Sequence, residues 1–188
     1  MPCGRPTEAT SSLRVQSVPE FAELSPMTTF LERVLEKLSV PRVSFSYPEI
    51  QPDLVEELLR VSDLNLADDR GPRVDCVRSL LLLQAGEFER SHSIVQAMSG
   101  SDAAYIHGMI HRVEGDFWNA KYWFQRSKKH PAFLGTPIDP FSITDMVEDT
   151  KGKTPPATTT ESLTKEFRTL LAFLLQPATG EGEGEGER

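Results

Sequence analysis

The sequence contains little cysteine and no long apolar run. Only two cysteines, Cys3 and Cys76, occur among 188 residues, which argues against a disulfide framework and fits a reducing compartment. No uninterrupted apolar run of about 18 residues is present, so we expect no membrane span. The first residues also lack the apolar core of a secretory signal. These absences predict a cytoplasmic protein, with the nucleus as the alternative.

Positive charge is scarce as well. The formal net charge at pH 7 is −8. The one dense basic run is short and consists of Arg126, Lys128, Lys129 and His130. A nucleic-acid-binding domain needs a basic face or stripe, so we expect no nucleic-acid partner.

Known catalytic signatures are a third absence. The sequence holds no nucleophile elbow, no phosphate-binding loop, no dinucleotide-binding fingerprint and no CxxC pair. This favours a protein that is not an enzyme, although the question stays open at this stage. No cofactor is expected.

The two ends of the chain differ from its middle. Residues 1–24 are rich in Ser, Thr and Pro, and we expect them to be disordered. Residues 177–188 form an acidic Gly/Glu repeat, which is typical of a solvated, disordered tail. The stretch between them, 25–176, is predicted to be a single α-helical domain, with a loop at 150–159.

Helical patterns fill the middle of the chain. Gly86 and Gly115 each follow an apolar helical stretch, and glycine commonly terminates helices. Asp116 and Asp139 stand where the N-cap of the following helix is expected. Adjacent helices joined by such short connections are expected to lie antiparallel.

A strongly amphipathic helix is predicted near the C-terminus, after the 150–159 loop. Thr160 or Ser162 is expected to cap it. Its apolar stripe consists of Leu163, Phe167, Leu170, Leu171 and Leu174.

The joints in the centre repeat. The segments Gly86-Glu87-Phe88 and Gly115-Asp116-Phe117 lie 29 residues apart, and each joins a longer helical pattern to a shorter one. A fixed period of this kind indicates a helical repeat. The second unit resembles a tetratricopeptide repeat, in which a Gly and an Ala let two helix backbones approach closely. The matching residues are Gly108, Ala120, Phe124 and Ser127, and Pro131 stands one residue before the place of the Pro that usually closes the unit.

The tetratricopeptide resemblance implies an all-α fold. The expected architecture is a set of antiparallel helical hairpins in a tetratricopeptide-like right-handed stack, closed by a C-terminal packing helix. The first unit departs from the pattern, because Ser91 takes the place of the Ala and Val95 that of the aromatic residue.

A second resemblance covers the stretch HGMIHRVEGDFWNAKYWF, from His107 to Phe124. It is similar to a group of uncharacterised proteins of bacteria and fungi that share the core H-G-x-x-H-R-x-E-G-D-x-x-N-A-x-Y-W-Y/F. This resemblance implies a family, and it implies no activity.

His107 and His111 are four residues apart and share one helix face with Glu114. Two imidazoles and a carboxylate at this spacing are able to hold a divalent metal. The zinc-protease pattern, however, requires Glu directly after the first His, where Gly108 stands. We therefore interpret the two histidines as buried residues of a helix seam and expect no metal. A metal or catalytic pair and a non-metal ligand pocket are the alternatives.

Further polar and aromatic residues accompany the two histidines. Arg112 is expected to pair with Glu114 or Asp116, and a buried network of this kind would be costly in a plain repeat protein. Aromatic side chains with a polar group are favoured where proteins meet partners. The candidate ligand- or partner-binding residues are His107, His111, Arg112, Glu114, Asp116, Asn119, Tyr122 and Trp123.

Two functions follow from these patterns. The favoured one is a protein-protein interaction scaffold or adaptor with a protein or peptide partner. The alternative is a small-ligand-binding protein or metal-dependent enzyme that uses the His/Glu/Asn cluster. Burial of the two histidine rings is the observation that separates them.

Overall fold

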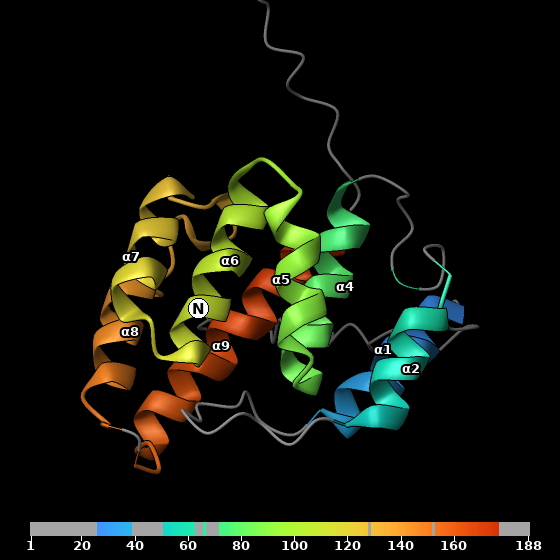
Figure 1. Cartoon of the computed structure of the whole chain (residues 1–188), viewed down its shortest axis with the longest axis horizontal. Helices are drawn as coiled ribbons and strands as arrows, with labels where there is room; N and C mark the ends of the chain where they lie inside the picture. The colour runs from blue at the N-terminus through green and yellow to red at the C-terminus, as the bar shows by residue number, and fades with distance from the viewer. Residues whose placement is uncertain are drawn as a thin grey trace, which may run out of the picture.

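The described part of the chain is all-helical. The structure is a computed structural model that describes residues 26–38, 51–62, 66, 72–127, 129–151 and 153–176. Within these ranges no residue forms a strand, so the all-α prediction is confirmed (Figure 1). The segments 1–24 and 177–188, expected to be disordered, lie outside the described residues.

The helices follow one another with short connections in the centre of the chain. Their bounds are α1 Pro26–Lys37, α2 Pro52–Arg60, α4 Pro72–Ala85, α5 Phe88–Gln96, α6 Ser101–Glu114, α7 Phe117–Arg126, the 3-10 helix η1 Pro131–Phe133, α8 Pro140–Glu148 and α9 Ala157–Leu174.

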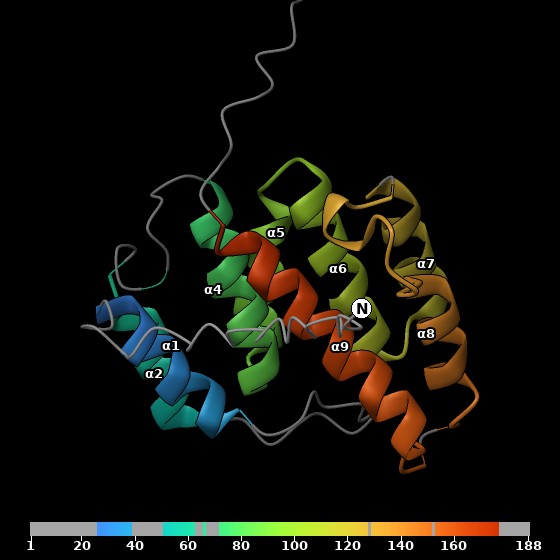
Figure 2. The same cartoon turned by 180° about the vertical axis from the view of Figure 1, so that it is seen from behind.

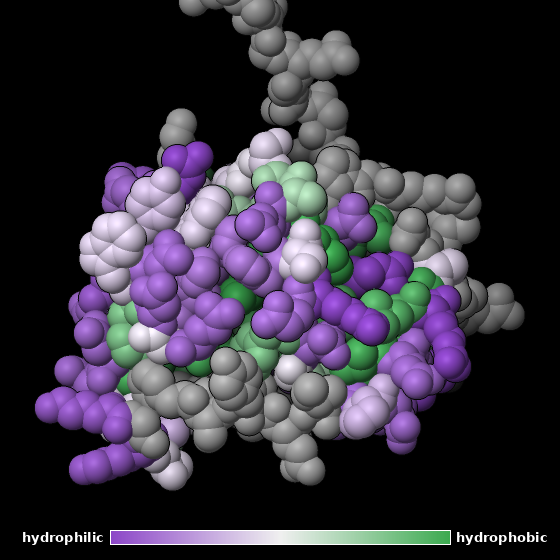
Figure 3. All heavy atoms as spheres, in the orientation of Figure 1, coloured by the Kyte–Doolittle hydropathy of each residue, from purple (hydrophilic) through white to green (hydrophobic). Residues whose placement is uncertain are grey.

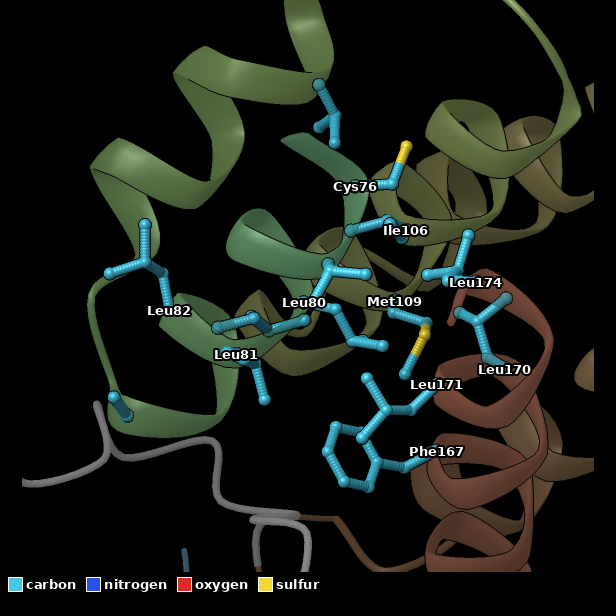
Figure 4. Close-up of a cluster of buried hydrophobic side chains, with 14 of the residues drawn as sticks. Cys76, Leu80, Leu81, Leu82, Ile106, Met109, Phe167, Leu170, Leu171 and Leu174 are labelled. Carbon is cyan, nitrogen blue, oxygen red and sulfur yellow. The ribbon is translucent and has the colours of Figure 1, made fainter. Parts of the chain in front are cut away.

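Helix α4 lies at the centre of the core and packs against α2, α5, α6 and α9. Its C-terminal half, residues 79–85, is buried throughout, which is the pattern of a helix segment surrounded by other elements. Asp75 in its first turn is exposed. Figure 4 shows its side chains meeting those of α6 and α9. The labelled core residues are Cys76, Leu80, Leu81, Leu82, Ile106, Met109, Phe167, Leu170, Leu171 and Leu174, all of them buried.

The two glycine joints end helices as predicted. Helix α4 ends before Gly86, and α6 ends before Gly115. Both glycines have a left-handed backbone, with φ of 91° and 85°, which side chains with a Cβ rarely adopt. Asp116 then caps α7 by accepting from the Asn119 backbone N–H, and Asp139 caps α8. Both predicted N-caps are confirmed.

Helices α6 and α7 lie side by side and approach closely at Gly108. A Cβ at position 108 would lie 2.7 Å from two ring atoms of Phe124. The prediction placed Ala120 opposite this glycine, but the Phe124 ring is what a side chain there would meet first. The Phe124 ring is longer than the Ala120 methyl group and lies over Gly108. Ala120, one turn earlier in α7, is fully buried.

Helix α9 crosses in front of α4 and α6 in the view of Figure 2 and reaches α8. All five residues of its predicted apolar stripe are buried. The helix begins at Ala157, so the expected loop 150–159 is three residues too long, and the proposed caps Thr160 and Ser162 lie inside the helix. Their hydroxyls donate to the carbonyls of Pro156 and Thr158, a bond that lets Thr and Ser remain helical.

None of the helices in the described ranges combines the length and the apolar character needed to cross a membrane.

Candidate functional site

Three histidines meet between α5 and α6. His92 comes from α5, and His107 and His111 come from successive turns of α6. One ligand nitrogen of each ring lies within 4.8 Å of the others. The rings of His107 and His111 are stacked with centroids 4.9 Å apart, while His92 meets both edge-on. The i, i+4 pair predicted from the sequence is therefore two thirds of a three-histidine centre.

His92 and His107 share a hydrogen bond between their Nε2 atoms, which lie 2.7 Å apart. One of the two nitrogens must carry the proton, and the other must accept with its lone pair. Burial, and then the charges that His92 and His111 would carry, lower the pKa of His107 to about 4. The ring of His107 is therefore neutral near pH 7, which is the protonation state that a metal ligand requires.

Both histidine rings are buried, and of the two expected functions this outcome favours the interaction scaffold over a site open to solvent. His107 is 5% and His111 is 9% exposed. Trp123 of α7 stacks on His107, with centroids 3.9 Å apart and planes 13° apart. This contact occupies a face of the imidazole and leaves the nitrogen at its edge directed at His92. The three histidines thus form a polar cluster that the Trp123 indole covers on one side, where it stacks on His107.

Glu114 and Asn119 complete the surroundings of His111. The Glu114 Oε2 atom lies 3.0 Å from His111 Nδ1, and the Asn119 side-chain nitrogen lies 3.1 Å from Nε2. A carboxylate on Nδ1 fixes the tautomer, as it does in many metal-bound histidines. His111 Nε2 then accepts from the Asn119 amide, so a metal ion could bind this nitrogen only if the Asn119 side chain moved away. Both residues were predicted for this site, and the structure brings them to it.

Arg112 takes no part in the centre. Its guanidinium pairs with Glu166 of α9 through both nitrogens, one of them 3.2 Å from Oε1. The predicted pairing with Glu114 or Asp116 is wrong. The side chain points into the α6–α9 interface, where Arg112 is 2% exposed and Glu166 is fully buried. Asp116, likewise predicted for the site, serves as the N-cap of α7.

Two important residues escaped sequence reasoning. His92 lies in the repeat unit that fits the tetratricopeptide pattern poorly, 15 residues before His107, so no local spacing connects the two. Glu166 stands within the apolar stripe of α9, and an acidic residue in such a stripe is the signal that indicates a buried partner.

The outer face of α7 carries exposed aromatic residues. Trp118 is 78% and Tyr122 is 45% exposed, and their rings are stacked with planes 10° apart. Arg126 lies over the Tyr122 and Trp123 rings, 5.7 and 5.5 Å from their centroids. Pale surface of near-neutral hydropathy gathers over α7 in Figure 3. Tyr122 therefore belongs to a surface, whereas Trp123 belongs to the histidine centre.

The centre has the donors for a small, nitrogen-preferring cation. With metal–nitrogen bonds of about 2.0–2.1 Å, nitrogens around a tetrahedral ion lie roughly 3.3 Å apart. The His92–His107 separation of 2.7 Å would have to widen. The planes of His107 and His111 differ by 16°, so one ring must tilt to aim its in-plane lone pair at a shared ion.

Comparison with known proteins finds no matching family model, no matching curated protein and no matching solved structure.

Proposed function

We propose that this protein binds one divalent transition-metal ion of the zinc class through His92, His107 and His111. The observation that carries the proposal is the convergence of three imidazole nitrogens within 4.8 Å of one another. The expectation of no metal was based on two histidines. His92 adds a third imidazole nitrogen that could bind the same ion. Three neutral imidazoles are a donor set suited to Zn²⁺ and its neighbours among the divalent ions.

Two further features support the proposal. Glu114 binds His111 Nδ1 at 3.0 Å, which orients the ring and makes its other nitrogen a stronger donor. His107 stays neutral in the folded protein because its pKa is lowered to about 4, so protons compete weakly for its ring. In the His92–His107 hydrogen bond one Nε2 atom carries a proton and cannot bind an ion. Metal binding therefore requires that ring to carry its proton on Nδ1 instead.

A three-histidine centre leaves one position of a tetrahedral ion to a ligand from outside. Catalytic zinc sites use this arrangement, and zinc lowers the pKa of a bound water to about 7. The alternative of a small-ligand-binding protein or metal-dependent enzyme therefore rests on this centre.

Metal titration of tag-free, chelator-treated full-length protein tests the proposal. Trp118 is replaced by Phe so that Trp123, which stacks on His107, is the single tryptophan. Titration with Co²⁺ and Zn²⁺ should change the Trp123 fluorescence with a stoichiometry of one ion per chain. Zn²⁺ at 100 times its Kd should stabilise the fold by about 2.7 kcal/mol. Affinity should fall as the pH drops toward about 4, the value to which the pKa of His107 is lowered, because the protonated ring cannot bind an ion.

Histidine variants locate the ion. His92→Gln and His107→Gln should each abolish saturable binding. His130→Gln is the matched control, because His130 is the remaining histidine and bonds to Asp102 outside the centre. Circular dichroism checks that each variant folds. If His92→Gln binds as the parent does, or if the parent binds no ion, the proposal fails.

A second candidate function is the protein-protein interaction scaffold. It is supported by the exposed stack of Trp118 and Tyr122 beside Arg126, since Trp, Tyr and Arg dominate the binding energy of protein interfaces. Selection of a displayed peptide library on the parent protein, with counter-selection on Trp118→Ala/Tyr122→Ala, tests it. Enriched peptides should bind the parent alone. Peptides that bind both equally would contradict an α7 interface.

The tetratricopeptide-like right-handed stack and the kinship with the uncharacterised bacterial and fungal group are likewise proposals. The stack is supported by the two left-handed glycine joints at Gly86 and Gly115 and by the close approach of Phe124 to Gly108.

A further inference from the structure

A cavity of about 230 Å³ lies where α6, α7, η1 and the start of α8 meet. Its lining shares no residue with the three-histidine centre. Four aromatic rings form its walls, those of Tyr105, Phe124, Phe133 and Phe141. A cavity of about 150 Å³ lined by apolar side chains is enough to hold a benzene ring, so this one has room for a single ring with a short substituent.

The walls are held in place by their own contacts. Tyr105 stacks on Phe133 with centroids 4.6 Å apart and meets Phe124 edge-on at 5.0 Å. The Tyr105 hydroxyl donates to Glu166 at 2.7 Å, which anchors the ring from the far end. Phe124 in turn meets Phe141 edge-on. Fixed aromatic walls accept a flat ring without the entropic cost of ordering the site.

Most polar groups of the lining already have partners. His130 Nε2 lies 2.8 Å from Asp102, and Nδ1 accepts from the Ala132 N–H. The Asp139 carboxylate accepts from the first turn of α8. The Ser127 hydroxyl donates to the Phe124 carbonyl. Each of these groups thus has a hydrogen-bond partner, and the Asp139 carboxylate is held within the N-cap of α8.

Lys129 is the exception. It lines the cavity and is exposed, and no hydrogen bond or ion pair to its ammonium group occurs among the residues described here. Its backbone has a φ of 53°, a left-handed conformation that a residue with a Cβ adopts at a cost. Its exposed ammonium group is therefore able to pair with an anionic group of a ligand in the cavity.

We propose that this cavity binds a small monocyclic aromatic carboxylate, with its ring between the four aromatic walls and its carboxylate at Lys129. The ring matches the apolar walls in size and shape. The carboxylate is opposite in charge to the Lys129 ammonium group, which has no hydrogen-bond or ion-pair partner among the described residues. A cationic ligand would be repelled by the Lys129 ammonium group. The Asp139 carboxylate, which has the opposite charge, is held by hydrogen bonds in the N-cap of α8. This site is independent of the proposed metal centre.

Titration of full-length, isotope-labelled protein with benzoate, benzyl alcohol and benzyltrimethylammonium tests the proposal by amide chemical shifts. A chelator is present, so that no carboxylate binds through a metal. Benzoate should saturate at millimolar concentrations or below, and its shifts should concentrate in residues 124–141. Benzyl alcohol should bind about three- to tenfold more weakly, because it lacks the charge that pairs with exposed Lys129.

Variants separate the charge from the cavity. Lys129→Gln should weaken benzoate about three- to tenfold and leave benzyl alcohol unchanged. Lys153→Gln, a control at another exposed lysine, should change neither ligand, and His92→Gln should retain benzoate binding. The proposal is overturned if benzoate does not saturate, if the cation binds more tightly, if the shifts lie elsewhere, or if Lys129→Gln has no effect.

Discussion

At the residue scale, His107 contacts both of the other histidines in the centre. It bonds to His92, stacks on Trp123 and His111, and is nearly fully buried. Each of these contacts is compatible with a neutral imidazole. Protonation of the ring is disfavoured because the added charge would be desolvated, beside two other imidazoles.

The pH dependence of stability should report this neutral state. The pKa of His107 is about 4 when folded and about 6.5 when unfolded. The unfolded chain therefore binds more protons between these values. Stability from this residue is complete above about pH 6.5 and is lost as the pH falls toward about 4. The loss is at most about 3 kcal/mol.

Urea denaturation of the metal-free parent and of His107→Gln at several pH values measures this effect. The difference in free energy of unfolding between the two should shrink as the pH falls through the window. A difference that stays constant from pH 7 to 4 would show that His107 titrates normally.

Gly108 should tolerate no side chain. A Cβ there would lie 2.7 Å from the buried Phe124 ring, and overpacking of this kind costs about 1–3 kcal/mol. Gly108→Leu should therefore lower the urea midpoint, although Leu favours the helix more than Gly does. Combining it with Phe124→Leu should restore part of the loss. An unchanged midpoint would contradict the close approach of α6 and α7.

At the scale of elements, one ion pair joins α6 to α9. Arg112 and Glu166 are both buried, and Tyr105 donates to the same carboxylate at 2.7 Å. The Arg112 Nε atom is buried without a hydrogen-bond partner among the described residues. Such a pair specifies how α9 docks more than it stabilises the fold, because desolvation offsets much of the attraction.

Breaking that pair from one side should be strongly destabilising. Glu166→Gln leaves Arg112 buried and unpaired, which typically costs about 3–5 kcal/mol. Guanidinium denaturation measures the change. Glu161→Gln on the same helix is the control, because its pair with Lys165 is exposed and its loss should change stability by less than about 1 kcal/mol. Equal effects of the two substitutions would contradict a structural role for the buried pair.

At the scale of the whole molecule, α4 is surrounded by other helices, and the candidate sites lie away from it. The histidine centre sits between α5 and α6 under α7, and the aromatic cavity lies between α6, α7, η1 and α8. Helix α6 contributes to both sites and to the core.

The acidic repeat should contribute nothing to this core. Deleting residues 177–188 should change the free energy of unfolding by less than about 0.5 kcal/mol, because a Gly/Glu repeat has little apolar surface to bury. Thermal denaturation followed by circular dichroism measures it. A clear loss of stability would show that the tail packs on the domain.

The sequence by itself determined the features that depend on neighbouring residues. The left-handed ends at Gly86 and Gly115, the caps Asp116 and Asp139, and the stripe of α9 follow from local backbone and periodicity. His107 and His111 were paired for the same reason, since four residues make about one helical turn. Local spacing carries this information without any knowledge of the fold.

Only the tertiary structure decided which helices supply the remaining partners. His92 reaches His107 across 15 residues, and Glu166 reaches Arg112 across 54. Neither separation matches the spacing of residues that share a helix face, so a single sequence does not indicate these contacts. Both partners are chosen by how helices pack, and the packing depends on burial summed over the entire core. For that reason local spacing predicted a pair of seam histidines, and the folded chain holds a three-histidine centre.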